Sequence, residues 1–125
     1  MLSDARAEAT IPVMRLRPAR EFYEGVLGLR PAAEESPGTD VTYECAGGTR
    51  LVLYEFGGPM TRSQTVAHFI VDDVPATVAE LRARGVRFDE YDIPELELVD
   101  GVATIGGRRF AWFKDPDLNV IGIHD

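Results

Sequence analysis

The chain has two histidines, and they are the side chains best suited to proton transfer near neutral pH. His68 and His124 are the only residues whose unperturbed side-chain pKa lies close to physiological pH. A histidine of this kind acts either as a general acid or base or as a packed or solvated side chain without a chemical role. His68 and His124 are therefore the candidate catalytic residues, and the structural role remains the alternative for both.

Aromatic residues are concentrated close to the end of the chain. Phe110, Trp112 and Phe113 fall within four positions, and because strand side chains alternate, Phe110 and Trp112 share one face while Phe113 takes the other. The Trp112 face either packs in the core or offers a flat apolar wall to a planar ligand. The predicted ligand-binding residues, in which the tyrosines serve as polar handles, are Trp112, Phe110, Tyr43, Tyr54 and Tyr91.

The charge balance indicates which partners to expect. The net charge is −8, from 21 acidic and 13 basic residues, which disfavours nucleic acid and anionic membrane surfaces as partners. Segment 89–100 carries acidic residues and no basic residue. At the mouth of a cavity it would attract a cationic ligand, and a solvated loop is the alternative.

The sequence is typical of a cytoplasmic protein. It has no apolar run long enough to span a bilayer, and its first residues lack the apolar core of a signal peptide. A single cysteine, Cys45, excludes an intrachain disulfide. We therefore expect a cytoplasmic protein without membrane contact.

The same strand-then-helix pattern occurs twice in the chain. In the later copy an apolar run ends at Val71, Asp73 can cap a helix, and Pro75 fits a first helical turn that leads to Gly85. In the earlier copy a short strand precedes a helix that ends before Gly28. An internal repeat of nearly half the chain length favours two modules of one kind.

The remaining patterns complete both modules. Helices are expected at 18–26 and from Pro75 to the residue before Gly85, and segment 92–105 reads as a hairpin extension or a lid. Strands are expected at 8–14, 29–33, 41–46, 50–56, 65–71, 86–91, 108–114 and 120–124. The sequence thus predicts an α+β protein with βαβββ modules at 1–56 and 65–125, joined by a linker at 57–64.

These patterns carry a family resemblance. The chain resembles the vicinal oxygen chelate superfamily, which includes glyoxalase I, extradiol dioxygenases, metal-dependent fosfomycin resistance transferases and bleomycin resistance proteins. The matching pieces are Arg20-Glu21-Phe22-Tyr23 through Leu27-Gly28-Leu29, the run from Phe69 to Val74, the run from Leu81 to Val86, and Phe113 to Asp117 with Asn119. Leu118 departs from the pattern, because the family turn commonly has glycine there.

The resemblance implies that the two modules form one compact domain whose mixed sheets curl around a cavity, often in a homodimer. It also implies a divalent metal ion such as Fe, Mn, Zn or Ni in active members. The family's ligand positions fall here on Glu8, Val66, Gly122 and a position near Leu53. Because only Glu8 has a donor atom, we favour a protein without the usual metal site.

A displaced metal site is the alternative. His68, His124 and Glu55 each lie two residues beyond an expected ligand position, so strand alternation keeps them on the same face. With Glu8 they would form the ligand set of a displaced site, at the cost of a shift of about 6.6 Å along each strand. No cofactor is favoured.

Two classes of function follow from the resemblance and the residues. The first is a metal-free member that binds, and so sequesters, a small molecule of aromatic or cationic character. The second is a lyase, isomerase or dioxygenase, metal-dependent or using a histidine as base, that acts on a small carbonyl or vicinally oxygenated substrate. We favour the binding protein, which is supported by the lost ligand positions, the acidic segment 89–100 and Trp112. Fold analogy does not decide between the two classes, because one fold hosts many chemistries. A purely structural or partner-binding domain is a third possibility without specific support.

Overall fold

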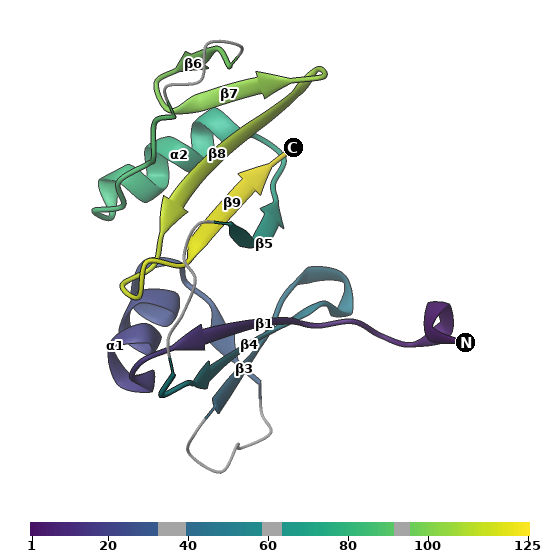
Figure 1. The fold of residues 1–125 in the computed structure, drawn as a ribbon. Helices are drawn as coiled ribbons and strands as arrows, with labels where there is room; N and C mark the ends of the chain where they lie inside the picture. Colours follow the sequence, from purple (N-terminus) through teal and green to yellow (C-terminus); the bar gives the residue numbers. More distant parts are fainter. Residues whose placement is uncertain (33–39, 59–63, 92–95) are drawn as a thin grey trace. The chain divides into compact units, whose positions relative to one another are not determined.

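A computed structural model of the chain describes residues 1–32, 40–58, 64–91 and 96–125. The chain divides into two compact units, Met1–Met60 and Thr61–Asp125, each with a mixed sheet and one principal helix (Figure 1). The α+β class and the paired βαβββ arrangement are confirmed. The association of the two modules into one curled domain around a cavity stays a prediction.

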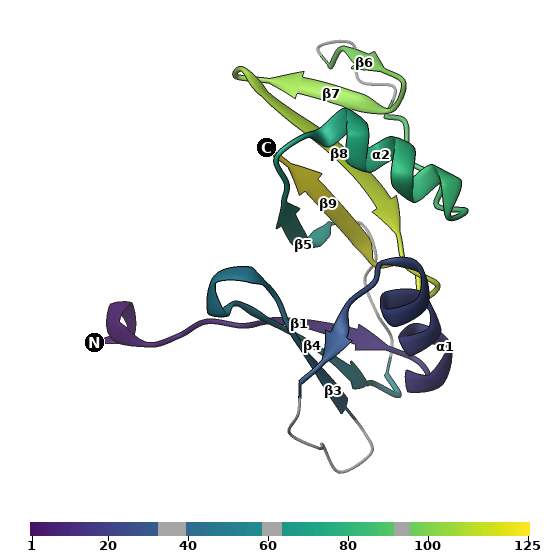
Figure 2. The ribbon, with the colours of Figure 1, turned by 180° about the vertical axis from the view of Figure 1, so that it is seen from behind.

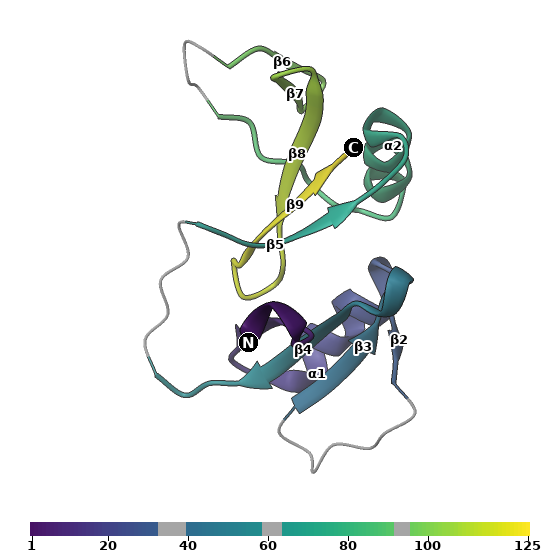
Figure 3. The same ribbon diagram turned by 90° about the vertical axis from the view of Figure 1, so that its right-hand side faces the viewer.

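The first unit is a four-stranded sheet with a helix. Its strands are in the order β1-β4-β3-β2, with β1 parallel to β4 and the other pairs antiparallel, and β2, β3 and β4 run side by side in Figure 3. Short 3-10 turns occupy Leu2–Asp4 and Ala46–Gly48. The main elements are β1 (Ala9–Val13), α1 (Leu16–Arg20), which continues as a π-helical segment (Glu21–Val26), β2 (Arg30–Pro31), β3 (Asp40–Glu44) and β4 (Arg50–Glu55).

Alternating apolar residues of this sheet form the core of the first unit. Ile11, Val13 and Leu53 have no exposed surface. The strands expected at 41–46 and 50–56 are confirmed as β3 and β4, which pair directly as a hairpin. The turn between them contains Gly47 and Gly48 at positive φ, a conformation that glycine adopts without steric cost.

The second unit is a five-stranded sheet with one helix. Its strands are in the order β5-β9-β8-β7-β6, with β5 parallel to β9 and the other pairs antiparallel. The elements are β5 (Thr65–Ile70), α2 (Val74–Ala83), β6 (Leu98–Val99), β7 (Val102–Ile105), β8 (Arg108–Lys114) and β9 (Val120–His124).

Helix α2 begins and ends where the sequence predicts. The Asp73 carboxylate accepts a hydrogen bond from the Ala76 amide at 3.0 Å, Pro75 lies in the first turn, and Gly85 has φ of 93°. The helix covers one face of its sheet, behind the strands in Figure 1 and in front of them in Figure 2. Val74 and Val78 are buried in that contact.

The prediction of a strand at 86–91 is wrong. The structure has only an isolated bridge between Phe88 and Phe113, followed by a hydrogen bond from the Asp89 amide to the Trp112 carbonyl at 2.7 Å. The reason is competition for one strand edge, since β7 already pairs with β8 from Arg108 to Phe110. Only the remaining part of that edge is available to residues 88 and 89.

The segment expected as a hairpin or a lid contains a hairpin in its described part. β6 and β7 pair through a two-residue turn in which Asp100 and Gly101 both have positive φ. This is the backbone conformation that tight hairpin turns require. The hairpin alternative is confirmed for residues 98–105, while residues 92–95 lie outside the described part of the chain.

The turn between β8 and β9 is held by a buried carboxylate. Asp115 accepts hydrogen bonds from the amides of Asp117 and Asn119 and from the Asn119 side chain, at 2.8 to 2.9 Å. Leu118 lies in this turn at φ of 68° and is 53% exposed.

Among the described residues no helix is long and apolar enough to cross a membrane.

Replacing Leu118 by glycine should stabilise the protein. A left-handed conformation costs a side-chain-bearing residue about 1–2 kcal/mol, part of which glycine loses again through its freer unfolded chain. We expect Leu118→Gly to raise the free energy of unfolding by about 0.5–1 kcal/mol in urea denaturation. Leu118→Ala, which keeps the strained conformation, should bring no gain, and a destabilised glycine variant would contradict the prediction.

Candidate functional site

Five ring-bearing side chains gather on the face of the second sheet that faces away from α2. The register places Phe110 opposite His124, and both Trp112 and His68 opposite Gly122, so these side chains share a face. The alternate residues Ala111, Phe113, Ile121 and Ile123 are at most 2% exposed, on the α2 side. We call His68, Tyr91, Phe110, Trp112 and His124 the aromatic face.

The rings of the aromatic face contact one another in a continuous chain. The centroids of Phe110 and Trp112 are 5.9 Å apart with nearly parallel planes, and Tyr91 meets Trp112 edge-on at 5.5 Å. Phe110 lies 5.3 Å from His124 and 6.3 Å from His68. The two histidine rings are 5.3 Å apart. These are the spacings of interacting aromatic pairs, so the face is a connected surface rather than scattered side chains.

A β-bulge determines that His68 belongs to this face. Thr65 pairs with Val120 and Ala67 with Ile121, so Val66 is an extra residue in β5. Without it, His68 would stand opposite Ile123 and point toward α2, because a slip of one residue exchanges the two faces of a strand. The bulge therefore brings His68 to the side of Phe110 and His124.

Gly122 provides the space that the His68 ring occupies. A Cβ atom at residue 122 would collide with Cε1 and Nδ1 of the His68 imidazole. The ring thus lies directly over the glycine backbone. The position that the family resemblance assigns to a metal-binding glutamate here contributes space rather than a donor atom.

Arg108 brings a positive charge to the edge of the aromatic face. Its guanidinium lies 5.6 Å from the Phe110 ring centroid, a cation–π geometry. Its Nη2 donates to Nδ1 of His124 at 2.8 Å, and its Nε donates to the backbone oxygen of Asp125 at 3.2 Å. Because an arginine always donates, Nδ1 of His124 is the acceptor in this contact, and the same nitrogen lies 3.2 Å from the backbone oxygen of Asp125.

The surroundings of His68 disfavour its charged form. The pKa of His68 is lowered from 6.5, first because its ring lies against the sheet and loses part of its hydration, and then because the Arg108 guanidinium and, when it is protonated, the His124 ring repel a further positive charge. His68 remains an exposed residue overall, and its pKa is shifted downward. Near neutral pH the ring is therefore uncharged and able to accept a proton.

The other predicted site residues lie in the first unit. Tyr43 is fully buried, packs on Tyr23 with centroids 6.2 Å apart, and donates to Glu24 at 2.9 Å. Burial, followed by this contact with the Glu24 carboxylate, raises the pKa of Tyr43. Tyr54 points to the opposite face of its strand, where it meets Phe56 edge-on. The structure thus groups Tyr91 with Phe110 and Trp112, and separates Tyr43 from Tyr54.

The side chains present do not fit the metal site that the family implies. Val66, Gly122 and Leu53 offer no donor atoms, and the Glu55 carboxylate is occupied in accepting from the Leu16 amide at 2.9 Å at the start of α1. Glu8 is an exposed residue that precedes β1. In the described ranges, no three His, Cys, Asp or Glu side chains come together as a metal site would need. No chemical step is therefore assigned to a metal ion.

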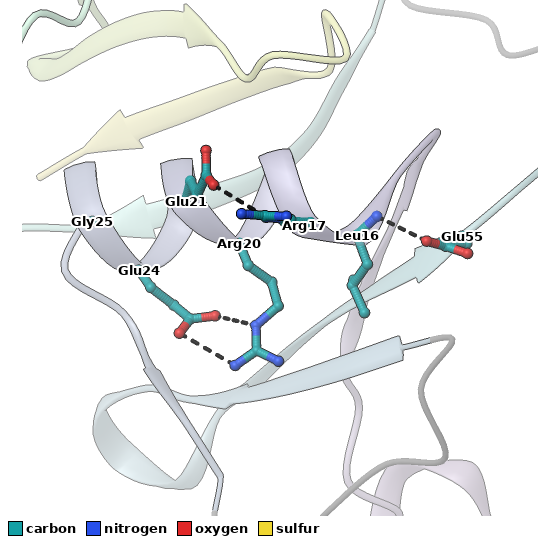
Figure 4. Close-up of a pocket in the computed structure, with 7 residues that line it drawn as sticks. All are labelled: Leu16, Arg17, Arg20, Glu21, Glu24, Gly25 and Glu55. Atoms are coloured by element: carbon teal, nitrogen blue, oxygen red, sulfur yellow. Dashed lines mark hydrogen bonds and ion pairs between the residues drawn. The ribbon is translucent and has the colours of Figure 1, made fainter.

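A hollow of about 720 Å³ runs along α1 in the first unit. Figure 4 shows that its polar groups are paired with one another: Arg20 with Glu24 at 2.6 Å, Arg17 with Glu21 at 3.7 Å, and Glu55 with the Leu16 amide. The Arg20 guanidinium lowers the pKa of Glu24. Exposed pairs of this kind stabilise a helix slightly and leave no group directed at a ligand. The aromatic face is the stronger candidate.

Sequence reasoning missed Arg108 and the role of Gly122. The alternation that assigned Phe110 and Trp112 to one face also places residue 108 there, so the signal for Arg108 was present. The role of Gly122 depends on the bulge at Val66, and the local residue pattern does not indicate this bulge. The role of Gly122 could therefore not be predicted from the sequence.

The comparison with protein families identifies this arrangement. The sequence profile of the Glyoxalase/Bleomycin resistance protein/Dioxygenase superfamily matches residues 6–123. The chain belongs to this superfamily. No curated protein matches the chain.

Solved structures agree with this assignment. One is TnmS3, an antibiotic binding protein from Streptomyces sp. CB03234, with 28% identity, a TM-score of 0.65 and coverage of 96% of this chain and 95% of that one. A glyoxalase/bleomycin resistance protein from the same source has 28% identity, a TM-score of 0.62 and coverage of 95% and 100%. A glyoxalase family protein from Enterococcus faecalis, at 18% identity, a TM-score of 0.69 and full coverage of both chains, shares the fold.

A methyl group at residue 122 should displace His68. We expect Gly122→Ala to lower the free energy of unfolding by roughly 1 kcal/mol, because the added Cβ overlaps the imidazole. In a His68→Ala background the same substitution should cost close to nothing. Urea denaturation of the four proteins of this double-mutant cycle measures the coupling, and an equal cost in both backgrounds would contradict the contact.

The pKa of His68, followed by NMR of its imidazole signals, should lie below 6.5. Arg108→Met should raise it toward the ordinary value, because one neighbouring positive charge is removed. Protonation of His68 therefore favours the unfolded chain. The contribution of the neutral His68 ring to the free energy of unfolding is complete above pH 6.5 and decreases as the pH falls. Arg82→Met, which removes an arginine from the Phe88 ring instead, serves as the control. A value of 6.5 or higher would disprove the assignment.

Proposed function

We propose that this superfamily member is a small-molecule-binding protein whose ligand is planar and aromatic and lies on the aromatic face of the second unit. The observation that carries the proposal is the continuous ring contact from Tyr91 through Trp112 and Phe110 to the two histidines. Binding in this proposal needs no metal ion.

The physical case rests on surface that the unit does not cover itself. Trp112 and Phe110 are half-buried, and α2 lies on the opposite side of their sheet. Large rings in a connected, partly exposed cluster are the usual lining of a site for an apolar or aromatic molecule. The antibiotic-binding activity of TnmS3, a relative at 28% identity, supports a ligand-binding role.

The other expectations about partners stay proposals of the same kind. A cationic ligand was expected from segment 89–100, but the Asp89 carboxylate is held by Lys114 at 3.1 Å and accepts from Tyr91 at 3.4 Å. The structure therefore gives more support to the aromatic character of the ligand than to a positive charge on it. A homodimer in the cytoplasm remains the expected state.

A second candidate function is a metal-free enzyme that uses His68 as a base. The observation in its favour is an uncharged imidazole close to Arg108 and His124. A neutral histidine beside a cation can take a proton from carbon next to a carbonyl group while the cation stabilises the developing oxyanion. Exchange of that proton with deuterated water, lost in His68→Ala, would favour the enzyme over the binding protein.

Binding of 2-naphthamide, a neutral two-ring probe, tests the proposal. Trp112 is the single tryptophan of the chain, so its fluorescence should change on titration. We expect Trp112→Ala to weaken binding roughly tenfold by calorimetry, because a central aromatic contact is lost.

The matched control is Phe88→Leu. Phe88 belongs to the same unit and packs against Phe113 on the α2 side of the sheet, with centroids 5.6 Å apart. This variant should keep the affinity of the original protein. A Trp112→Ala variant that binds the probe unchanged would remove the aromatic face from the site.

A further inference from the structure

Arg108 is a charged side chain that contacts the aromatic face, and its contacts fix its direction. The guanidinium is held by the Phe110 ring, by Nδ1 of His124 and by the backbone oxygen of Asp125. Three contacts on one guanidinium reduce the rotamer freedom that ligand binding would otherwise have to remove. Arg108 is therefore a prepared donor rather than a mobile surface charge.

Its donor capacity is only partly used. Nε and Nη2 make the two hydrogen bonds, while Nη1 has no partner within the described ranges. One partner is an imidazole nitrogen of His124 and the other is the main-chain oxygen of Asp125. An arginine fork is best satisfied by an anionic group with two oxygen atoms, such as a carboxylate.

The side-chain carboxylate of Asp125, the residue whose main-chain oxygen contacts Arg108, is committed to another residue. The Asp125 side chain binds Arg109, at 2.6 Å to its Nε and 2.8 Å to its amide. These bonds, the amide bond first, lower the pKa of Asp125 and keep it ionised for Arg109. Asp89 is paired with Lys114, at the other end of β8. In the part of the chain that the structure describes, Arg108 forms an ion pair with no carboxylate side chain.

The Arg108 guanidinium is thus a local positive charge in a chain whose net charge is −8. The two histidines beside it do not add an anion, because a histidine side chain is either neutral or positively charged. A ligand that lies on Phe110 and Trp112 would bring its edge to the guanidinium, because Arg108 and Phe110 are two residues apart on one face of β8.

We propose that the ligand of this site is an aromatic acid, a planar ring system that carries a carboxylate or an equally acidic oxygen group, and that Arg108 selects it. This inference rests on the proposed binding function and adds the chemical class of the ligand. Trp112 and Phe110 contact the ring system, and the Arg108 fork binds the anionic group at its edge. A cationic aromatic is disfavoured by the same charge.

Three probes of one shape test the selection on the full chain: 2-naphthoate, 2-naphthamide and 2-naphthylmethylammonium. Calorimetry at low salt should give 2-naphthoate an affinity about tenfold higher than the amide, and the ammonium probe the lowest. The preference should shrink as salt is added, because the site is partly exposed. Arg108→Met keeps the apolar stem and should remove most of the advantage of the acid over the amide.

The matched control is Arg82→Met. Arg82 lies over Phe88 at 5.6 Å, the same distance as Arg108 over Phe110, but on the α2 side of the sheet. The Arg82→Met variant should leave the ranking of the three probes unchanged.

The possible failures are distinguishable. Equal binding of the acid and the amide, tighter binding of the ammonium probe, or an acid preference that survives Arg108→Met would each overturn the selection by Arg108 while the binding function stands. Failure of all three probes to bind would overturn the proposed function and this inference together.

Discussion

The register between β5 and β9 is the constraint on which the candidate site depends. One extra residue in β5, Val66, shifts the pairing so that His68 stands opposite Gly122 instead of pointing toward α2. Since side chains alternate along a strand, this single insertion decides which half of β5 faces the helix and which joins the aromatic rings. The missing side chain at Gly122 then allows the imidazole to lie flat against the sheet. Bulge and glycine act together, because either alone would leave His68 elsewhere.

Local signals in the sequence predicted most of the fold. Helix α2 could be predicted because Asp73, Pro75 and Gly85 each act within one turn of the helix, and β8 because its alternation is unbroken. The strand expected at 86–91 failed for a non-local reason, since β7 takes most of the β8 edge. For the site, strand alternation correctly grouped Phe110 with Trp112. The local sequence gives no signal for the bulge at Val66 or for the packing of Tyr43 on Tyr23. These depend on pairing partners far away in the chain.

Val66 and Gly122 have no donor atoms for a metal ion, but both residues contribute to the geometry of the candidate site. In this superfamily member the two positions are occupied by a bulge residue and a glycine, and the neighbouring His68 fills the space that results. A metal ion at this place would need several convergent donors and would repel a nearby guanidinium. Arg108, which contacts His124 directly, supplies a positive charge of its own without any ion. The second unit therefore carries a fixed cation at the edge of its aromatic face.

Overall charge and local charge point in opposite directions here, and the local one decides recognition. A net charge of −8 acts at long range and is screened over about 10 Å at ordinary ionic strength. A ligand lying on Phe110 meets Arg108 at contact distance, where screening is weak, while Asp125 is neutralised by Arg109 and Asp89 by Lys114. The pairing of Asp125 with Arg109 matters as much as Arg108 itself, because an unpaired aspartate beside the guanidinium would cancel its attraction for an anion. The selectivity of the site is therefore set by which basic residue each carboxylate binds, not by the number of acidic residues in the chain.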